Sequence, residues 1–492
     1  FQLWDGWNAA IQKINPNAFV LPGIGSERDR LNMSKLRSRA KTLYLDYQGR
    51  EGLTPPWMAG KKGKELRAVL GLNPAGITFS VGIADKYRWK DSVQTGPEIK
   101  IWVCDGAAHG LRPKMAKFAG VLHDRRWTKP VEELYTWLYK AEPYLRNEGY
   151  PVATVGLLFS QKTARFYGPL AAQRGYREQD FSNGVYQTMI EARIPTDVVH
   201  EDLLDESDLS RFRVLILPNA ACLSDAQCDR LRRFVADGGS LVATFESSLY
   251  DEWGKPRTRF GLGDLFGVEP AGPVQGPMLN SYLRLVEERK QHPLLRGFGD
   301  AGRMVNGIFR LPVKATVEFP DAPLMLVAPY PDLPMEEVYP RDLDRNDPQV
   351  FARQIGKGRV VYIPFDLDRT AWEMLDPDHL RLIENCVRWA AFEDIPLEVQ
   401  GPGVLDLAVW RQKSSMAVHL VNLTNPMMMK GPFRSFYPSG PQKVRVRLPE
   451  GKRPRRVSLL SAGVQARFQA RDGWLAFDVP SFQLHEIAAI DF

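Results

Sequence analysis

Apolar and polar positions divide the chain into three stretches with different periodicities. Over residues 1–145, segments with helical spacing alternate with short apolar runs such as LYLD at 43–46 and GITFS at 76–80. Over residues 146–395, longer runs of Val, Leu and Ile alternate with helical segments, and over residues 396–492 short strands are separated by Gly, Pro and charged turns. The first two patterns indicate parallel sheets covered by helices, and the third indicates an antiparallel β-sandwich.

The middle stretch has the clearest pattern. Its predicted buried strands are VATVGLLFS, TDVVH, FRVLILPNAA, GSLVATFES and GRVVYIPFD, and the helices between them begin with Ser and end with Gly. This alternation predicts a doubly wound domain. Residues 255–355 are rich in Pro and Gly and are expected to form a long insertion in it.

Polar residues follow the predicted strands of the first stretch. Asp46, Gln48 and Arg50 come after one strand, and EIKIWVCDGAAHG at 98–110 is interpreted as a looser repeat that places Asp105 and His109 at another strand end. In a parallel barrel the carboxyl ends of the strands form the active-site face.

Composition excludes several classes of protein. The 492 residues carry a net charge of +7, and no basic run is longer than short ones such as GKRPRR. This argues against nucleic-acid binding. No apolar run reaches the length of about 18 residues that a membrane span needs. The four cysteines form no CxxC pair and have no His cluster beside them, so neither a metal nor a disulfide is expected. Because no GxGxxG or P-loop motif occurs, no cofactor is expected either.

Two segments carry a resemblance to a known family. FRVLILPNAACLSDAQCDRLRRFVADGGSLVATFESSLYDEWG resembles the core of the trimerisation domain of family-42 β-galactosidases, and AVHLVNLTN with SFQLHEIAAIDF resembles their sandwich. The resemblance implies an α/β chain with the C-terminal part of a TIM barrel at 1–145, an amidotransferase-like trimerisation domain at 146–395 and a β-sandwich at 396–492. It also implies a carbohydrate substrate and a homotrimer formed through the middle domain.

The residues at the turn after GGSLVATF indicate whether the middle domain is catalytic or serves only for assembly. Glutamine amidotransferases need a thiolate at this position, and here the chain has Glu246, Ser247 and Ser248 without the glycines of a GxSxG elbow. We interpret the domain as a scaffold used for assembly, with Glu246 as an N-cap or a subunit contact. An amidotransferase-like enzyme is the less favoured alternative.

Glycoside hydrolysis normally needs two carboxyl groups. The resemblance implies an acid/base Glu on a fourth barrel strand, expected to precede Phe1, and a nucleophilic Glu at the end of the seventh. GITFSVG looks like the seventh strand, but it ends in Ser80, Val81 and Gly82, and the nearest acid is Asp85. Two hypotheses therefore stay open: a fragment of a glycoside hydrolase, or a sugar-binding or assembly relative without catalysis.

Three local clusters supply the candidate site. The catalytic candidates are Asp46, Asp85 and Asp105; the substrate-binding candidates are Gln48, Arg50, Glu51, Trp57, Arg88, Trp89, His109 and Arg112. Each has a structural alternative: an Asp46–Arg50 ion pair, a Trp that packs a loop, and a His that only donates a hydrogen bond. Asp366, Arg369 and Trp372 are weaker candidates for contact with a neighbouring subunit's site, and the Met-rich PMMMKGPF at 426–433 is either an interface or a mobile loop.

Overall fold

The computed structural model describes residues 1–21, 31–46, 52–82, 89, 91–117, 123–145, 149–342 and 345–492. The chain forms two compact units. Unit 1 comprises Phe1–Val152, Arg193–Pro195 and Pro396–Phe492, and unit 2 comprises Ala153–Ala192 and Thr196–Ile395. Unit 1 therefore combines the first and third stretches of the sequence pattern. The division into three domains stays a prediction.

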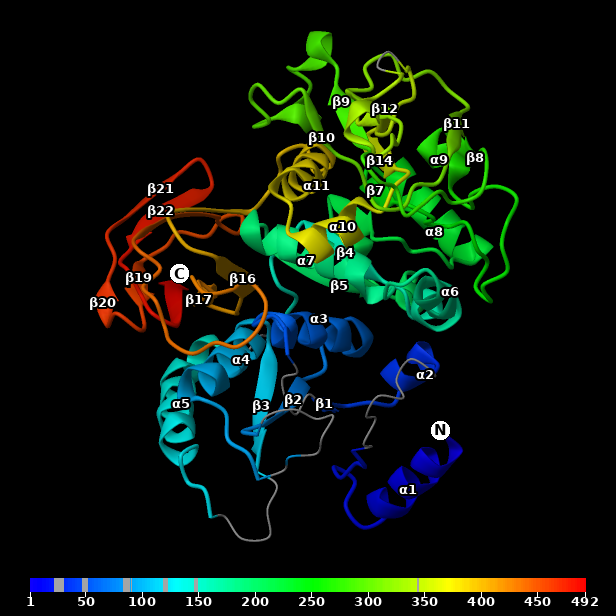
Figure 1. Ribbon diagram of the computed structural model, residues 1–492. Coiled ribbons are helices and arrows are strands. Elements are labelled where there is room, and N and C mark those ends of the chain that lie inside the picture. The colour runs from blue at the N-terminus through cyan, green and yellow to red at the C-terminus, as the bar shows by residue number, and fades with distance from the viewer. Residues whose placement is uncertain are drawn as a thin grey trace. The chain divides into compact units, whose positions relative to one another are not determined.

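The N-terminal part of unit 1 is a parallel sheet with helices (Figure 1). The strands β1 (Leu43–Asp46), β2 (Ala75–Ser80) and β3 (Leu111–Ala116) lie in that order, and Asp46 pairs in register with Thr78, which pairs with Lys114. The helices are α1 (Gln2–Gln12), α2 (Met33–Arg37), α3 (Met58–Leu70), α4 (Gly96–Ala108) and α5 (Thr128–Ala141). Helix α3 packs against β1 and β2, and α4 packs against β3.

One predicted strand of this region is a helix. Residues 96–108 form α4, with Thr95 as N-cap residue and Pro97 in the first turn. The apolar run in IKIWVC imitates a buried strand because α4 is covered nearly all round, and such a helix has little amphipathic contrast. The true strand, β3, was missed because LRPKMA contains a proline and two basic residues. Proline is tolerated there because β3 is the last strand of the sheet among the described residues.

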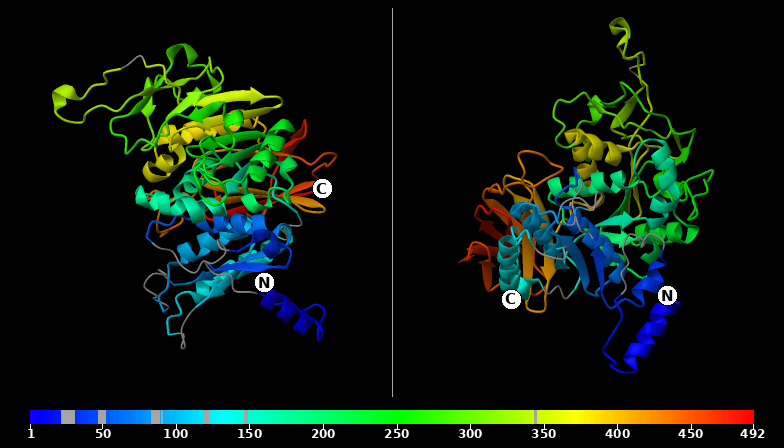
Figure 2. Two further views of the ribbon diagram at one scale, coloured as in Figure 1. Left: turned by 90° about the vertical axis from the view of Figure 1, so that its right-hand side faces the viewer. Right: turned by 60° about the horizontal axis from the view of Figure 1, so that its bottom comes forward.

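Helix α1 stands apart from the sheet in both views of Figure 2. Its Trp4 is buried and donates from Nε1 to the carbonyl oxygen of Val20 at 3.0 Å. The side chains of Leu3 and Trp7 are 71% and 56% exposed. The apolar run NAFVLPGIG at 17–25 also predicts a strand, but none occurs in its described part, residues 17–21.

The C-terminal part of unit 1 is the predicted antiparallel sandwich. One sheet has the order β15 (Leu397–Gln400), β18 (Gln442–Arg447), β22 (Trp474–Val479), β21 (Phe468–Arg471). The other has the order β16 (Leu405–Arg411), β17 (Ser415–Asn422), β23 (His485–Asp491), β19 (Arg456–Leu459), β20 (Val464–Gln465). Alternate residues of both sheets, such as Val418, Leu420, Val444 and Val446, form a common apolar core.

Unit 2 is a doubly wound domain. Its six-stranded sheet has the order β13 (Phe351–Ile355), β14 (Gly358–Ile363), β7 (Ser240–Thr244), β6 (Val214–Leu217), β4 (Val155–Phe159), β5 (Thr196–His200), and only β13 runs antiparallel to its neighbour. The helices are α6 (Gly168–Gln173), α7 (Gln179–Glu191), α8 (Asp225–Ala236), α9 (Gly263–Phe266), α10 (Leu367–Met374) and α11 (Pro377–Ala390). The predicted strands and main helices of this domain are confirmed.

The predicted insertion carries two small sheets of its own. Strands β8 (Val268–Pro270) and β11 (Val313–Ala315) form one, and β10 (Arg303–Val305), β9 (Tyr282–Leu285) and β12 (Leu324–Val327) form the other. Beyond β12 the chain extends away from the rest of unit 2 around the short helix Met335–Glu337 (Figure 2). Among the described residues, no helix of either unit is long and apolar enough to cross a membrane.

Candidate functional site

The carboxyl edge of the sheet β1–β2–β3 is the first candidate site. Asp46 is the last residue of β1 and is exposed, and Ser80, the last residue of β2, is half-buried. Ser80 Oγ accepts from the Gly82 amide at 3.0 Å, and Gln94 Nε2 donates to the Ser80 carbonyl oxygen at 3.2 Å. Gln94 also donates its backbone amide to the Val81 carbonyl oxygen at 2.7 Å, so the end of β2 is held firmly.

Charged and aromatic groups lie in the segments that follow these strands. Lys117, directly after β3, forms an ion pair with Asp91 at 2.5 Å. Trp89 is 57% exposed, and Ser92 Oγ donates to its carbonyl oxygen at 2.7 Å. A carboxylate, an ion pair and an exposed indole at one sheet edge can hydrogen-bond hydroxyl groups and stack on an apolar ring face.

The structure tests the position of only some predicted residues of this edge. Gln48, Arg50, Glu51, Asp85 and Arg88 lie outside the described residues, and their roles stay predictions. Trp57 is the N-cap residue of α3 and is 1% exposed, so its ring packs inside unit 1 and is closed to a ligand. Asp46 and Trp89 are the predicted residues that the structure places, exposed, at or just after this edge.

Asp105, His109 and Arg112 lie at the opposite edge, and their predicted position at a strand's carboxyl end is wrong. Asp105 belongs to the last turn of α4, and His109 is the residue that ends the helix. Arg112 is the second residue of β3, at the amino end of that strand. Because helix α4 runs antiparallel to the strands it connects, its last turn lies at the edge where β3 begins.

Asp105 and His109 join the helix to the sandwich. His109 Nε2 lies 3.0 Å from Asp406 Oδ2 of β16, and Asp105 Oδ2 accepts from the Gly60 amide at 2.6 Å. Burial, and next the Asp406 carboxylate, raise the pKa of Asp105 well above its usual value. Burial opposes ionisation of Asp406 as well, but His109 and Lys64 outweigh it and lower its pKa to about 2. Of the two carboxyls, Asp406 therefore ionises more readily than Asp105.

The donor set of this cluster resembles a metal site, but its surroundings do not fit one. One ligand atom each of Asp105, His109 and Asp406 lies within 4.8 Å of the others. Lys64 lowers the pKa of both carboxyls and, together with Arg67, that of His109, so positive charge already compensates the cluster. A divalent cation there would be repelled, and the geometry favours a structural role.

Sequence reasoning missed the two sandwich residues of this junction. Asp406 stands in the apolar strand LDLAVWR, and Trp410 of the same strand donates from Nε1 to the Ala108 carbonyl oxygen at 2.8 Å. The Arg67 guanidinium stacks on the Trp410 ring at 4.7 Å. A lone buried Asp in an apolar strand was the only local signal, because its partners lie some three hundred positions earlier.

The carboxyl edge of the sheet in unit 2 is also polar, but it is closed. Glu246, after β7, is 2% exposed. Its Oε2 accepts from Arg174 Nη1 at 2.5 Å and from the Tyr167 hydroxyl at 2.6 Å, and Oε1 accepts from the Tyr250 hydroxyl at 3.1 Å. No helix begins at Glu246, so both the N-cap and the subunit contact predicted for it are wrong.

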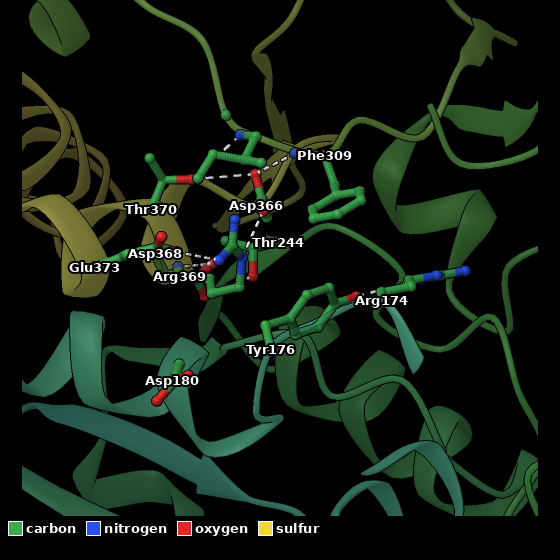
Figure 3. Close-up of polar contacts among 12 residues, drawn as sticks. Arg174, Tyr176, Asp180, Thr244, Phe309, Asp366, Asp368, Arg369, Thr370 and Glu373 are labelled. Carbon is green, nitrogen blue, oxygen red and sulfur yellow. Dashed lines mark hydrogen bonds and ion pairs between the residues drawn. The ribbon is translucent and has the colours of Figure 1, made fainter. Parts of the chain in front are cut away.

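A second ion-pair network lies beside the first (Figure 3). Asp366 Oδ2 accepts from Arg369 Nε at 2.7 Å, and its Oδ1 accepts from the Phe309 amide at 2.9 Å. Arg369 also pairs with Glu373 at 2.5 Å, and Figure 3 shows Tyr176 between Arg369 and Arg174. Burial raises the pKa of Asp366 to about 6. Asp366, Arg369 and Trp372 are buried within unit 2, while Glu373 is 52% exposed. The contact predicted for the first three with a neighbouring subunit's site stays a prediction.

The cysteines and serines described at this corner are not activated as nucleophiles. Burial raises the pKa of Cys222 to about 12 and that of Cys228 to about 11, so neither is a thiolate at neutral pH. Ser247 and Ser248 are fully buried, and Ser247 Oγ donates to the carbonyl oxygens of Thr244 and Leu217. The geometry does not support an amidotransferase-like reaction at this corner.

Comparison with known proteins identifies the class of the middle domain. Residues 153–269 match the model of the β-galactosidase trimerisation domain. The β-galactosidase GanA of Bacillus subtilis is 39% identical over 88 residues, which are 17% of this chain and 12% of GanA. The β-galactosidase GalA of Bacillus licheniformis is 35% identical over 91 residues, again 17% of this chain and 12% of that protein. The aligned stretch thus spans about an eighth of these relatives.

Solved structures extend the likeness of fold to the whole chain. An α-L-fucosidase, isoenzyme 2 from Paenibacillus thiaminolyticus, superimposes with a TM-score of 0.73 at 18% identity, over 99% of this chain and 70% of that one. A GH42 β-galactosidase from G. stearothermophilus superimposes with a TM-score of 0.69 at 15% identity, over 100% and 66%. The predicted fold class and the resemblance to family-42 β-galactosidases are confirmed.

Proposed function

We propose that this protein is a glycoside hydrolase of the family-42 type whose substrate binds at the carboxyl edge of β1–β2–β3. The observation that carries the proposal is the β-galactosidase trimerisation domain at 153–269, set in a chain whose whole fold is that of glycoside hydrolases. Asp46 is its catalytic candidate, because it is the exposed carboxylate at the end of a parallel strand. Trp89 stacks on the sugar.

The same trimerisation domain supports a homo-oligomer, which we propose to be a trimer formed through unit 2. Light scattering on the purified protein at micromolar concentration measures this. A mass of three times 55.7 kDa is expected. A monomer would contradict the assembly and leave the catalytic proposal standing.

The catalytic proposal is tested by hydrolysis. The protein is assayed with 4-nitrophenyl β-D-galactopyranoside and 4-nitrophenyl α-L-fucopyranoside, the sugar classes of its structural neighbours. We expect turnover of one of them and a loss of about 10²–10⁴-fold in kcat on Asp46→Asn, the size of an acid–base contribution. The control is Asp472→Asn, an exposed turn residue at φ 52° where Asn is well tolerated. Hydrolysis unchanged in Asp46→Asn would contradict the role of Asp46.

A second candidate function is carbohydrate binding without cleavage. It is favoured by one observation: β2 ends in Ser80, where the resemblance implies a nucleophilic Glu. This candidate would be supported over the hydrolase if the protein bound a galactoside, lost that binding in the Asp46→Asn variant, and hydrolysed no glycoside.

A further inference from the structure

A loop of the sandwich reaches the carboxyl edge of the N-terminal sheet. The segment 425–434, between β17 and β18, holds the Met-rich sequence, and its orange trace passes beside α4 in Figure 1. Because the parallel strands run toward this edge and α3 and α4 run back from it, the first turns of both helices mark the edge. Contacts to those turns therefore place the loop.

Two contacts fix the loop to the start of α4. Thr95, the N-cap residue of α4, donates from Oγ1 to the Phe433 carbonyl oxygen at 3.1 Å. Arg434 lies 3.7 Å from Glu98 in the first turn of the same helix. Phe433 is 1% exposed, so this end of the loop is anchored in unit 1.

Further contacts fix the loop to the segment between β1 and α3. The Gly431 amide donates to the Thr54 carbonyl oxygen at 3.3 Å. A Cβ placed on Gly431 would lie 2.6 Å from Met428 Sδ and 3.6 Å from a Leu53 methyl carbon, so these side chains meet above the glycine. Gly431 has φ +120°, a conformation that side-chain-bearing residues rarely adopt. The loop is thus held against both connections that lead from the sheet, the one between β1 and α3 and the one between β2 and α4.

The loop turns apolar side chains outward at this place. Met427 is 77% exposed, Met428 38% and Leu53 66%. The bend that exposes them is itself ordered: Asn425 Oδ1 accepts from the Met427 amide at 3.2 Å, and Asn425 Nδ2 donates to the Pro432 carbonyl oxygen at 3.1 Å. Gly52 follows Asp46 by six positions, so the two lie at most about 20 Å apart. Exposed thioethers on a loop that is held at the same sheet edge as Asp46 suit an adaptable apolar contact.

We propose that Leu53, Met427 and Met428 form an apolar subsite for the leaving group of the glycoside, the aglycone or the ring that follows the cleaved bond. The inference rests on the proposed function of the edge at Asp46 and adds a specificity determinant supplied by the sandwich. One end of the loop is anchored to the first turn of α4, and its methionines are exposed. An aglycone with an apolar face gains contacts there that the sugar ring itself does not need.

The test measures binding of two thioglycosides to the full chain by calorimetry. Phenyl 1-thio-β-D-galactopyranoside carries an aromatic aglycone, and methyl 1-thio-β-D-galactopyranoside lacks it. In the double variant Met427→Ala/Met428→Ala we expect about tenfold weaker binding of the phenyl compound and less than about twofold change for the methyl compound. The single variant Met427→Ala, whose side chain is mostly exposed, shows a smaller loss and guards against a folding defect. Met335→Ala, 74% exposed in unit 2, is the matched control.

The other possible results distinguish a failure of the subsite from a failure of the proposed function. Equal affinities in the double variant and the unsubstituted protein, or equal losses for both thioglycosides, would overturn the subsite and leave the hydrolase proposal intact. If the double variant dissociates an oligomer, the methionines belong to a subunit interface and the subsite is overturned. If neither thioglycoside binds the unsubstituted protein while an α-L-fucoside analogue does, the subsite is overturned and the hydrolase proposal stands. Binding of no glycoside at all would overturn both the subsite and the proposed function.

Discussion

The two parallel sheets of this chain have carboxyl edges that differ in one physical respect. In unit 1 the edge presents Asp46 exposed and Trp89 at 57% exposure. In unit 2 the corresponding edge is also charged, yet Glu246 is 2% exposed and Asp366 is fully buried. Both edges are where α/β folds place their ligand sites, so topology alone does not distinguish them.

The difference teaches that the accessibility of the charges decides which edge can do chemistry. Glu246 is already bonded to one guanidinium and two tyrosine hydroxyls, and Asp366 to one guanidinium, one amide and the Thr370 hydroxyl. A substrate would have to displace these partners and leave charges buried without compensation, which costs several kcal/mol per ion. The edge in unit 2 therefore acts as internal structure, whereas the described part of the edge in unit 1 presents exposed groups to a ligand.

The largest expected effect is a loss of stability when Glu246 is removed from the buried network at the edge in unit 2. Glu246→Ala removes the partner of Arg174 and of two tyrosine hydroxyls, and we expect the free energy of unfolding to fall by about 2–4 kcal/mol, since Arg174 keeps some contact with water. Urea unfolding measures it, with Glu373→Ala, whose side chain is 52% exposed, as a control that loses under about 1 kcal/mol. Hydrolysis at 20 °C stays unchanged in both. A variant that keeps its stability and loses activity would make this edge a site after all.

The next effect is a pH dependence of stability that arises in unit 2. Burial raises the pKa of Glu201, after β5, to about 8 and that of Asp368 to about 7. Because folding raises the pKa of these carboxyls, their protonation stabilises the folded state. This contribution to the free energy of unfolding is complete at acid pH. This stability is lost as the pH rises from the unfolded-state pKa, about 4.5, through the folded-state value.

Glu201→Gln tests this directly. The glutamine does not ionise, so its unfolding free energy should fall less between pH 5 and pH 8 than that of the unsubstituted protein. Thermal unfolding at several pH values gives the slopes, and Glu206→Gln, an exposed neighbour in sequence, should leave the slope unchanged. Parallel curves for Glu201→Gln and the unsubstituted protein would show that Glu201 ionises normally in the fold.

The sequence predicted those features of the two edges that depend on neighbouring residues, and it did not predict those that depend on residues far apart in the chain. The strands of unit 2 were found because each is a local apolar run bounded by turn residues. The strand predicted as GSLVATFES is β7, which ends at Thr244, so the chain turns just before Glu246. What the corner does was not predictable, because Arg174 and Tyr167 lie more than seventy positions earlier and no local pattern pairs them with Glu246. Exposure is a property of the assembled fold.

In unit 1 the sequence predicted Asp46 at a strand end and misplaced Asp105 and His109. The error has a local cause, since a helix covered on nearly all sides and a buried strand have the same apolar composition over six residues. Thr95 and Pro97 were the available signals for a helix start. The partner Asp406 was beyond local reach, as was the contact of loop 425–434 with the start of α4.

A smaller effect is expected for Trp89 in unit 1, where a substitution should weaken ligand binding without lowering the stability of the fold. Trp89→Ala removes a largely exposed ring, so the unfolding free energy should change by less than about 0.5 kcal/mol. If the indole stacks on the sugar, KM rises about tenfold with kcat little changed, as expected for the loss of roughly 1–2 kcal/mol of binding. The matched control is Trp253→Ala in unit 2, a ring that is 61% exposed and should leave KM unaltered. Equal KM values for both variants would remove Trp89 from the site.

The smallest effect is expected at the amino edge of the same sheet. Arg112 was predicted to bind substrate, but it is the second residue of β3, two strand residues before the position that pairs with Thr78 and Asp46. Its side chain is exposed at the start of the strand, so Arg112→Ala should change the unfolding free energy by less than about 0.5 kcal/mol. Its kcat/KM should equal that of the unsubstituted protein, because a group at the amino edge does not reach a ligand held at the carboxyl edge. A tenfold loss of kcat/KM in Arg112→Ala would place the substrate at the other end of the strands, and Asp46 and Trp89 would then have to be inert.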